Sequence, residues 1–155
     1  MILGIDPGSS GAIAVFKPDI GHLSMIDMPV LTVSRNGKEK REVNPHIIAS
    51  IFRDREPATA IFEKVGAMPG QGVSSMFQFG RSVGTVEGVL AALNIPVTYV
   101  TPQVWQKACG IRGGKDGSRM RAIELFPAYA QLFARKMDNG RADAACMAWW
   151  GATQS

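Results

Sequence analysis

Three carboxylates stand at positions where the chain passes from one predicted element to the next. Asp6 follows the apolar run 2–5, Glu63 follows the apolar run 58–62, and Asp143 lies in the first turns of a predicted C-terminal helix. If the two runs form adjacent parallel strands, Asp6 and Glu63 emerge side by side at one edge of the sheet. The small residues around Asp143 would let its helix lie close to that sheet, so all three carboxylates are expected to converge.

Converging carboxylates have a restricted set of chemical uses. They repel one another unless a cation neutralises them or one takes up a proton. All-oxygen ligands suit the hard ions Mg²⁺ and Mn²⁺. Two such ions about 3.5–4 Å apart can activate a water and stabilise the leaving oxygen of a phosphodiester. The acids therefore predict nuclease chemistry with two Mg²⁺ or Mn²⁺ ions per active site.

Each acid also has an ordinary structural explanation. Asp6 could be a turn residue, Glu63 could pair with the adjacent Lys64, and Asp143 could interact with the dipole of its helix. Taken separately, these explanations are the better ones. It is the combination of two strand ends and one helix start that favours a functional site.

The elements that would position these acids follow from the apolar pattern. Strands are expected at 2–5, 11–16, 22–28, 58–62 and 97–100, and helices at about 44–56, 74–93, 102 onwards, 118–126 and 140–150. A tight turn joins the first two strands, and helices separate the later ones. This order predicts one α/β domain over residues 1–155, with a mixed five-stranded sheet covered by helices on both faces. The polar, basic segment 34–41 is expected to turn at Asn36-Gly37.

Composition narrows the class of partner. Lys and Arg number 17 against 13 Asp and Glu, so the net charge of +4 favours a polyanion. The sequence has no signal-peptide pattern and no apolar run long enough to span a bilayer. A cytoplasmic protein with no membrane partner is expected, with Cys109 and Cys146 as reduced thiols.

Three motifs in this order resemble those of the RuvC-type Holliday junction resolvases, which belong to the ribonuclease H-like superfamily. Ile2-Leu3-Gly4-Ile5-Asp6-Pro7-Gly8 resembles the first-strand signature, Glu63-Lys64-Val65 the strand-ending Glu motif, and Ala142-Asp143-Ala144-Ala145 the final-helix motif. The resemblance covers nearly the whole chain. The Pro-Gly-Gln-Gly loop, Thr101-Pro102 with Trp105, and Lys115-Asp116 with Ser118 are most similar to phage or prophage members.

The resemblance implies a ribonuclease H-like fold and a catalytic metal site formed by Asp6, Glu63 and Asp143. It also implies a homodimer, joined through the helix 74–92, that resolves four-way DNA junctions by paired nicks. Such an endonuclease would serve DNA recombination and repair in the cytoplasm of a bacterial or phage-infected cell. A two-fold dimer suits a two-fold substrate.

The chain departs from the family at one position of the site. The bacterial resolvases have an acid or His three residues before the final Asp, where this chain has Gly140. Helix geometry favours Asn139 as the substitute, whereas charge favours Asp138. We expect Asp138 to be the fourth catalytic and metal-binding residue, and the alternative is that it caps the helix.

Candidate DNA contacts fall in two loops and two helices. The loop 66–72 is expected to enter the junction, with Met68 as an apolar wedge and Gln71 beside it. Phe77 is another candidate wedge, although a place in the core is the preferred interpretation. Phosphate contacts are expected from Arg81, Lys107, Arg112, Lys115, Ser118 and Arg119.

Other functions remain open. A nuclease of the same fold could act on other branched DNA or on RNA–DNA hybrids, because all of these offer the same phosphodiester. A junction-binding module without catalysis is a further alternative, given Gly140. A phosphotransferase of the kinase–actin type would need two duplicated domains, for which 155 residues are too few.

Overall fold

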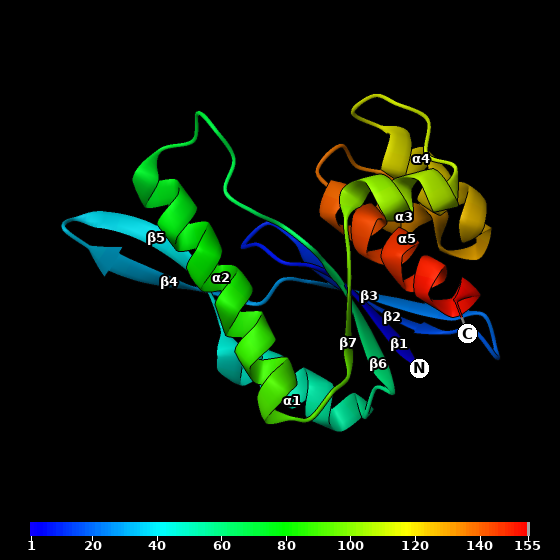
Figure 1. The fold of residues 1–155 in the computed structure, drawn as a ribbon, viewed down its shortest axis with the longest axis horizontal. Helices are drawn as coiled ribbons and strands as arrows, with labels where there is room; N and C mark the ends of the chain where they lie inside the picture. Colours follow the sequence, from blue (N-terminus) through cyan, green and yellow to red (C-terminus); the bar gives the residue numbers. More distant parts are fainter. Residues whose placement is uncertain (155) are drawn as a thin grey trace.

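The computed structural model describes residues 1–154 as a five-stranded sheet with helices on both faces (Figure 1). The strand order is β3-β2-β1-β6-β7, with β1–β2 and β2–β3 antiparallel and β1–β6 and β6–β7 parallel. The strands are β1 Ile2–Asp6, β2 Ala12–Lys17, β3 His22–Asp27, β6 Thr59–Glu63 and β7 Val97–Val100. The mixed sheet predicted from the sequence is confirmed.

Helices cover the two faces of the sheet unequally. One face carries α3 Pro102–Cys109, α4 Gly117–Leu125, the 3₁₀ helix η1 Pro127–Phe133 and α5 Asn139–Thr153. The other carries α1 Pro45–Arg55 and α2 Val73–Ala92. Each helical layer closes its own hydrophobic cluster with alternate residues of the central strands, as the two-residue periodicity of a strand requires.

Helix α5 packs directly on β1 because both elements carry small residues at the contact. A Cβ atom on Gly4 would lie 2.0 Å from the carbonyl oxygen of Ala144, and one on Gly151 would lie 2.5 Å from Ile61. Any side chain at either position would therefore push the helix off the sheet. This close approach fixes the first turns of α5 beside the carboxyl end of β1.

The segment 30–43 differs from the sequence-based expectation. It forms a separate hairpin of β4 Val30–Arg35 and β5 Lys38–Val43, of which only the turn was predicted. Asn36 and Gly37 have φ of 53° and 69°, which two-residue hairpin turns require. The strands escaped prediction because they are mostly polar and exposed, without an alternating apolar pattern.

The N-terminal half of α2 stands away from the sheet (Figure 1). Only Ser82, Val86 and Leu90 of this helix are buried. Phe77 is 67% exposed, so its interpretation as a core residue is wrong. Across residues 1–154, no helix is long and apolar enough to cross a membrane.

Candidate active site

The sheet register places two of the three predicted acids next to each other. In the parallel β1–β6 pair, Ile5 is opposite Phe62, so Asp6 and Glu63 are the next residues along. Both share the strand face of Gly4 and Ile61, which is the face covered by α5. Asp143 lies in the second turn of α5, over the same end of the sheet.

The three carboxyl groups act on one another electrostatically. Burial, followed by the negative charges of Glu63 and Asp143, raises the pKa of Asp6 to about 8. Burial and the charge of Asp143 also raise the pKa of Glu63, and burial raises the pKa of Asp143. A shared low-dielectric environment that disfavours three charges at once is the cause.

Two neighbouring side chains hold these acids in place. The indole Nε1 of Trp105, which is buried in α3, donates a hydrogen bond of 3.2 Å to Oε1 of Glu63. The hydroxyl of Ser118, at the start of α4, lies close enough to the carboxylate of Asp143 to lower its pKa, which opposes the effect of burial. Ser118 was predicted from the sequence to contact DNA, and no role was predicted for Trp105. A Trp beside a helix start was the available signal, because a buried indole N–H needs an acceptor.

The donor set fits a hard divalent cation. Asp143 keeps one oxygen, Oδ1, buried without a hydrogen-bond partner, and the raised pKa values mean that ionisation of the three groups is disfavoured without a positive charge beside them. A cation held by carboxylate oxygens would supply that compensation. Within residues 1–154, no three His, Cys, Asp or Glu side chains already stand close enough to hold one ion together, so binding would require the carboxylates to draw inward.

The structure does not bring Asp138 to the three acids. Its carboxylate, 2% exposed, accepts the backbone N–H of Arg135 at 2.8 Å and the guanidinium of the same residue at 2.8 Å. Arg141 lies 3.9 Å away. Although burial alone would raise the pKa of Asp138, the hydrogen bonds from Arg135 hold it below its usual value. Asp138 occupies the N-cap position of α5, but its side chain does not cap the helix. Both carboxylate oxygens accept hydrogen bonds from Arg135 and are therefore not free to bind a metal.

The position that carries the fourth acid or His in the bacterial resolvases is closed by the backbone. A Cβ atom on Gly140 would lie 3.0 Å from Oδ2 of Asp6 and 2.9 Å from the carbonyl oxygen of Ser10. This position faces the site as the family geometry implies, yet the helix is too close to admit a side chain. Asn139, the other candidate, is exposed at the first position of α5.

Arg119 is a structural residue, which corrects its assignment to DNA. It is 8% exposed, and its guanidinium donates to the carbonyl oxygens of Phe133 at 3.0 Å and Ala134 at 3.1 Å. It also bonds to Asp116 at 2.6 Å. These contacts tie α4 to η1 and leave the side chain little access to a ligand.

The remaining predicted DNA contacts lie on the surface. Arg81 is exposed on α2 but forms an ion pair of 3.5 Å with Glu42 of the hairpin. The residues that are exposed and form no ion pair within residues 1–154 are Met68, Gln71, Lys107, Arg112 and Lys115. Met68 and Gln71 belong to the loop between β6 and α2, which adjoins the acid-bearing end of β6.

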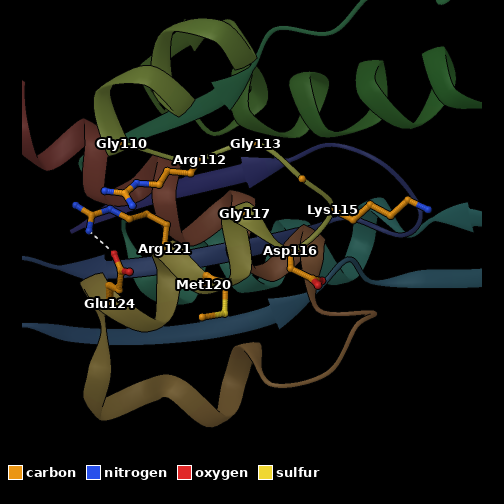
Figure 2. A pocket seen from close by; sticks show the side chains of 10 residues that line it. Gly110, Arg112, Gly113, Lys115, Asp116, Gly117, Met120, Arg121 and Glu124 are labelled. Carbon is orange, nitrogen blue, oxygen red and sulfur yellow. Dashed lines mark hydrogen bonds and ion pairs between the residues drawn. The ribbon is translucent and has the colours of Figure 1, made fainter.

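A pocket of about 660 Å³ lies beside α4, separate from the acids (Figure 2). The glycine-rich loop 110–117 forms one wall, and Met120, Arg121 and Glu124 form the other. Figure 2 shows Arg112 and Lys115 projecting from the loop in opposite directions. Ser118, the residue that interacts with Asp143, follows this loop directly in the sequence. The loop that carries Arg112 and Lys115 is thereby connected to the acid site.

The fold and the acid cluster define the class: the chain has a ribonuclease H-like fold with acids at the carboxyl ends of β1 and β6 and on the last helix. Two solved structures of RuvC from Thermus thermophilus share this fold, one of them in complex with a Holliday junction substrate. The complex has a TM-score of 0.59 at 14% sequence identity, and the other structure has a TM-score of 0.60 at 13% identity. Both similarities cover 99% of this chain and 96% of the RuvC chain.

One relative is similar to part of this chain in sequence. The chain is 32% identical, over 85 residues, to the chloroplastic Holliday junction resolvase MOC1 of Chlamydomonas reinhardtii. The matched segment is 54% of this chain but spans only 10% of the length of that relative. No protein-family profile matches the chain.

Proposed function

We propose that this protein is a metal-dependent endodeoxyribonuclease that resolves four-way DNA junctions. The observation that carries the proposal is the burial of three mutually repelling carboxyl groups, Asp6, Glu63 and Asp143, at one edge of a RuvC-like sheet. The similarity to a junction resolvase over 85 residues points to the same substrate class.

Asp6, Glu63 and Asp143 would hold Mg²⁺ or Mn²⁺, and two ions per site are part of the proposal. Such ions activate a water and stabilise the leaving oxygen of a phosphodiester. The chain itself supplies orientation: Trp105 fixes Glu63, and Ser118 fixes Asp143. Asp138 is left out of the proposed ligand set because Arg135 and Arg141 already engage it.

We propose a homodimer joined through the exposed face of α2. Val73 is 88% exposed on this helix, and Phe77 lies one turn later on the same face. A Cβ atom on Gly80, Gly84 or Gly88 would meet nothing within 4 Å, so these glycines do not serve packing within the chain. A small, apolar stripe allows the same helix of a second copy to approach closely. Two sites related by a two-fold axis would then cut a junction symmetrically.

The proposed DNA contacts are the predicted residues that are exposed and form no ion pair within residues 1–154. They are Met68 and Gln71 in the loop after β6, and Lys107, Arg112 and Lys115 on α3 and the loop that follows it. Cations bind the phosphate backbone, so junction shape rather than base sequence would be the main determinant of binding. The proposed location is the cytoplasm of a bacterial or phage-infected cell.

The decisive experiment is cleavage of a labelled synthetic four-way junction with Mg²⁺, Mn²⁺ or chelator, beside duplex, flap and RNA–DNA hybrid controls. Paired symmetric nicks confined to the junction and to the metal-containing reactions are expected. Junction binding without cleavage in any metal would identify a non-catalytic module, which the backbone closure at Gly140 makes the second candidate. Cleavage of flaps or hybrids instead would keep the metal site and change the substrate.

A further inference from the structure

A second groove lies on the α2 side of the acid site. The hairpin β4–β5, the turn between β1 and β2, and the N-terminal half of α2 enclose a volume of about 510 Å³. Figure 1 shows the hairpin beside this half of α2. The lining residues are Ser9, Ser10, Glu39, Lys40, Arg41, Ser74, Ser75, Gln78, Phe79 and Ser82.

The hairpin is anchored in this position by its own side chains. Glu42 forms ion pairs with Arg35 at 3.1 Å and with Arg81 of α2 at 3.5 Å. On the opposite wall, the turn after β1 touches α2, because a Cβ atom on Gly8 would lie 3.5 Å from the ring of Phe79. The groove is therefore a fixed feature of the fold rather than a gap beside a loose hairpin.

Two cations reach across the groove from the hairpin. The ammonium of Lys40 donates to the hydroxyl of Ser74 at 3.4 Å, and the guanidinium of Arg41 donates to the carbonyl oxygen of Ser9 at 3.2 Å. Neither cation forms an ion pair with any residue from 1 to 154. Glu39, at the exposed rim, is the one acid in the lining.

The chemistry of this lining fits a phosphodiester backbone. Lysine and arginine bind phosphate oxygens, and serine hydroxyls and glutamine amides donate hydrogen bonds to them. Ser9, Ser10, Ser74, Ser75 and Gln78 provide such donors beside Lys40 and Arg41, whereas the hydroxyl of the buried Ser82 already donates to the carbonyl oxygen of Gln78.

The groove opens next to the acids. The carbonyl oxygen of Ser10, which belongs to the groove wall, and Oδ2 of Asp6 both lie within 3.0 Å of the same point, the position of a Cβ on Gly140. The wall of the groove at Ser10 therefore adjoins the proposed metal site.

We propose that this groove binds the phosphodiester backbone of the DNA strand next to the bond that is cut, with Lys40 and Arg41 as its main contacts. The position of the bound strand relative to the bond that is cut rests on the junction resolvase function proposed above. The groove's affinity for a nucleic acid strand rests on its own lining.

The test compares the double variant Lys40→Gln/Arg41→Gln with Arg53→Gln/Arg55→Gln. The control pair removes the same charge from the last turn of α1, at the opposite end of β6 from Glu63. Binding of a labelled four-way junction and of a labelled single-stranded oligonucleotide is measured over a range of salt concentrations, without divalent metal. Thermal melting verifies that both variants fold.

We expect the hairpin variant to bind both DNAs at least ~10-fold more weakly than the control at low salt. Its plot of log affinity against log salt should be shallower, by about 0.7–0.9 for each phosphate that the variant no longer neutralises. Ser75→Glu, which adds a negative charge to the groove without removing a cation, should weaken binding in the same direction. Equal affinity and equal salt slope for the hairpin and control variants would overturn the groove proposal.

The two proposals fail separately. If the wild-type protein cuts junctions but the hairpin variant binds as the control does, the junction resolvase stands and the groove does not. If the wild-type protein cuts no DNA but the hairpin variant loses strand affinity, the groove stands and the catalytic function does not.

Discussion

Among the three acids, Asp6 has the pKa that is raised furthest. Burial and two neighbouring carboxylates raise its pKa to about 8, so near neutral pH the metal-free side chain is mostly protonated. A cation would have to displace that proton. The residue-scale predictions follow from this coupling between charge, proton and metal.

Asp6→Asn is expected to reduce cleavage of a four-way junction by at least ~10²–10³-fold, because the amide cannot contribute a negative charge to metal binding. Junction affinity should remain within about twofold of the wild type, since the basic surface is untouched. Single-turnover cleavage and a binding titration measure the two effects. Wild-type cleavage rates in Mg²⁺ would show that Asp6 is not a metal ligand.

The same substitution should stabilise the metal-free protein at high pH. The pKa of Asp6 is raised from 3.8 to about 8, so its contribution to stability is fully present below pH 3.8 and is lost as pH rises through 8. An Asn escapes this loss. At pH 9 in chelator, we expect Asp6→Asn to melt several degrees above the wild type, about 2–4 °C for each kcal/mol. The difference should shrink towards pH 4, and a constant difference would contradict the pKa shift.

Ser118→Ala separates the two roles assigned to Ser118. Its hydroxyl interacts with Asp143, so we expect cleavage to fall by roughly 10-fold through loss of positioning. Junction affinity should be unchanged. Ser50→Ala, on the exposed surface of α1, is the control. Weaker junction binding with normal single-turnover cleavage would return Ser118 to the DNA contacts expected from the sequence.

At the scale of elements, the helical layer that contains α4, η1 and α5 depends on polar contacts as well as on apolar packing. Arg119 joins α4 to the end of η1 through two carbonyl groups, and Arg141 of α5 pairs with Asp27 of β3 at 2.6 Å. The elements that carry Ser118 and Asp143 are thereby held in place by two arginines, one of which, Arg119, was predicted from the sequence to contact DNA.

Arg119→Ala is expected to lower the free energy of unfolding by roughly 2–4 kcal/mol, because it leaves the carbonyls of Phe133 and Ala134 without their donor. Urea denaturation followed by circular dichroism measures this. Arg112→Ala, in the exposed loop before α4, should change stability by less than about 0.5 kcal/mol while weakening junction binding. The reverse ranking of the two stabilities would contradict the structural role of Arg119.

For the whole molecule, the exposed face of α2 is the feature with the largest physical consequence. An extended apolar and small-residue surface is costly to leave in water and suits association with a second copy. In the proposed dimer, the placement of this face would also decide whether two active sites face one junction.

Gly84→Glu is expected to convert a dimer near twice 16.7 kDa into a monomer, because the added side chain and charge occupy the proposed contact. The monomer should fold, since a Cβ at this position meets nothing within 4 Å and Glu is a better helix former than Gly. Light scattering coupled to gel filtration measures the mass. Ala108→Glu, exposed on α3, should remain dimeric, and a dimeric Gly84→Glu protein would place the interface elsewhere.

The sequence by itself determined the five-stranded mixed sheet, although not the β4–β5 hairpin, and it predicted that Asp6, Glu63 and Asp143 converge. Apolar periodicity predicts which side of an element faces the core. Turn-forming residues and glycines indicate where an element ends. These are local properties, so they can be read without coordinates.

Only the tertiary structure decided which groups each of these side chains contacts. Asp138 accepts hydrogen bonds from Arg135, and Arg119 donates to a carbonyl oxygen of η1. Trp105 donates a hydrogen bond to Glu63, which lies 42 residues away in the sequence. The backbone closure at Gly140 and the groove beside Ser10 likewise exist only once α5 and the hairpin are docked. The physical reason is that a pattern in sequence fixes the direction of a side chain, whereas its partner is fixed by packing between distant segments.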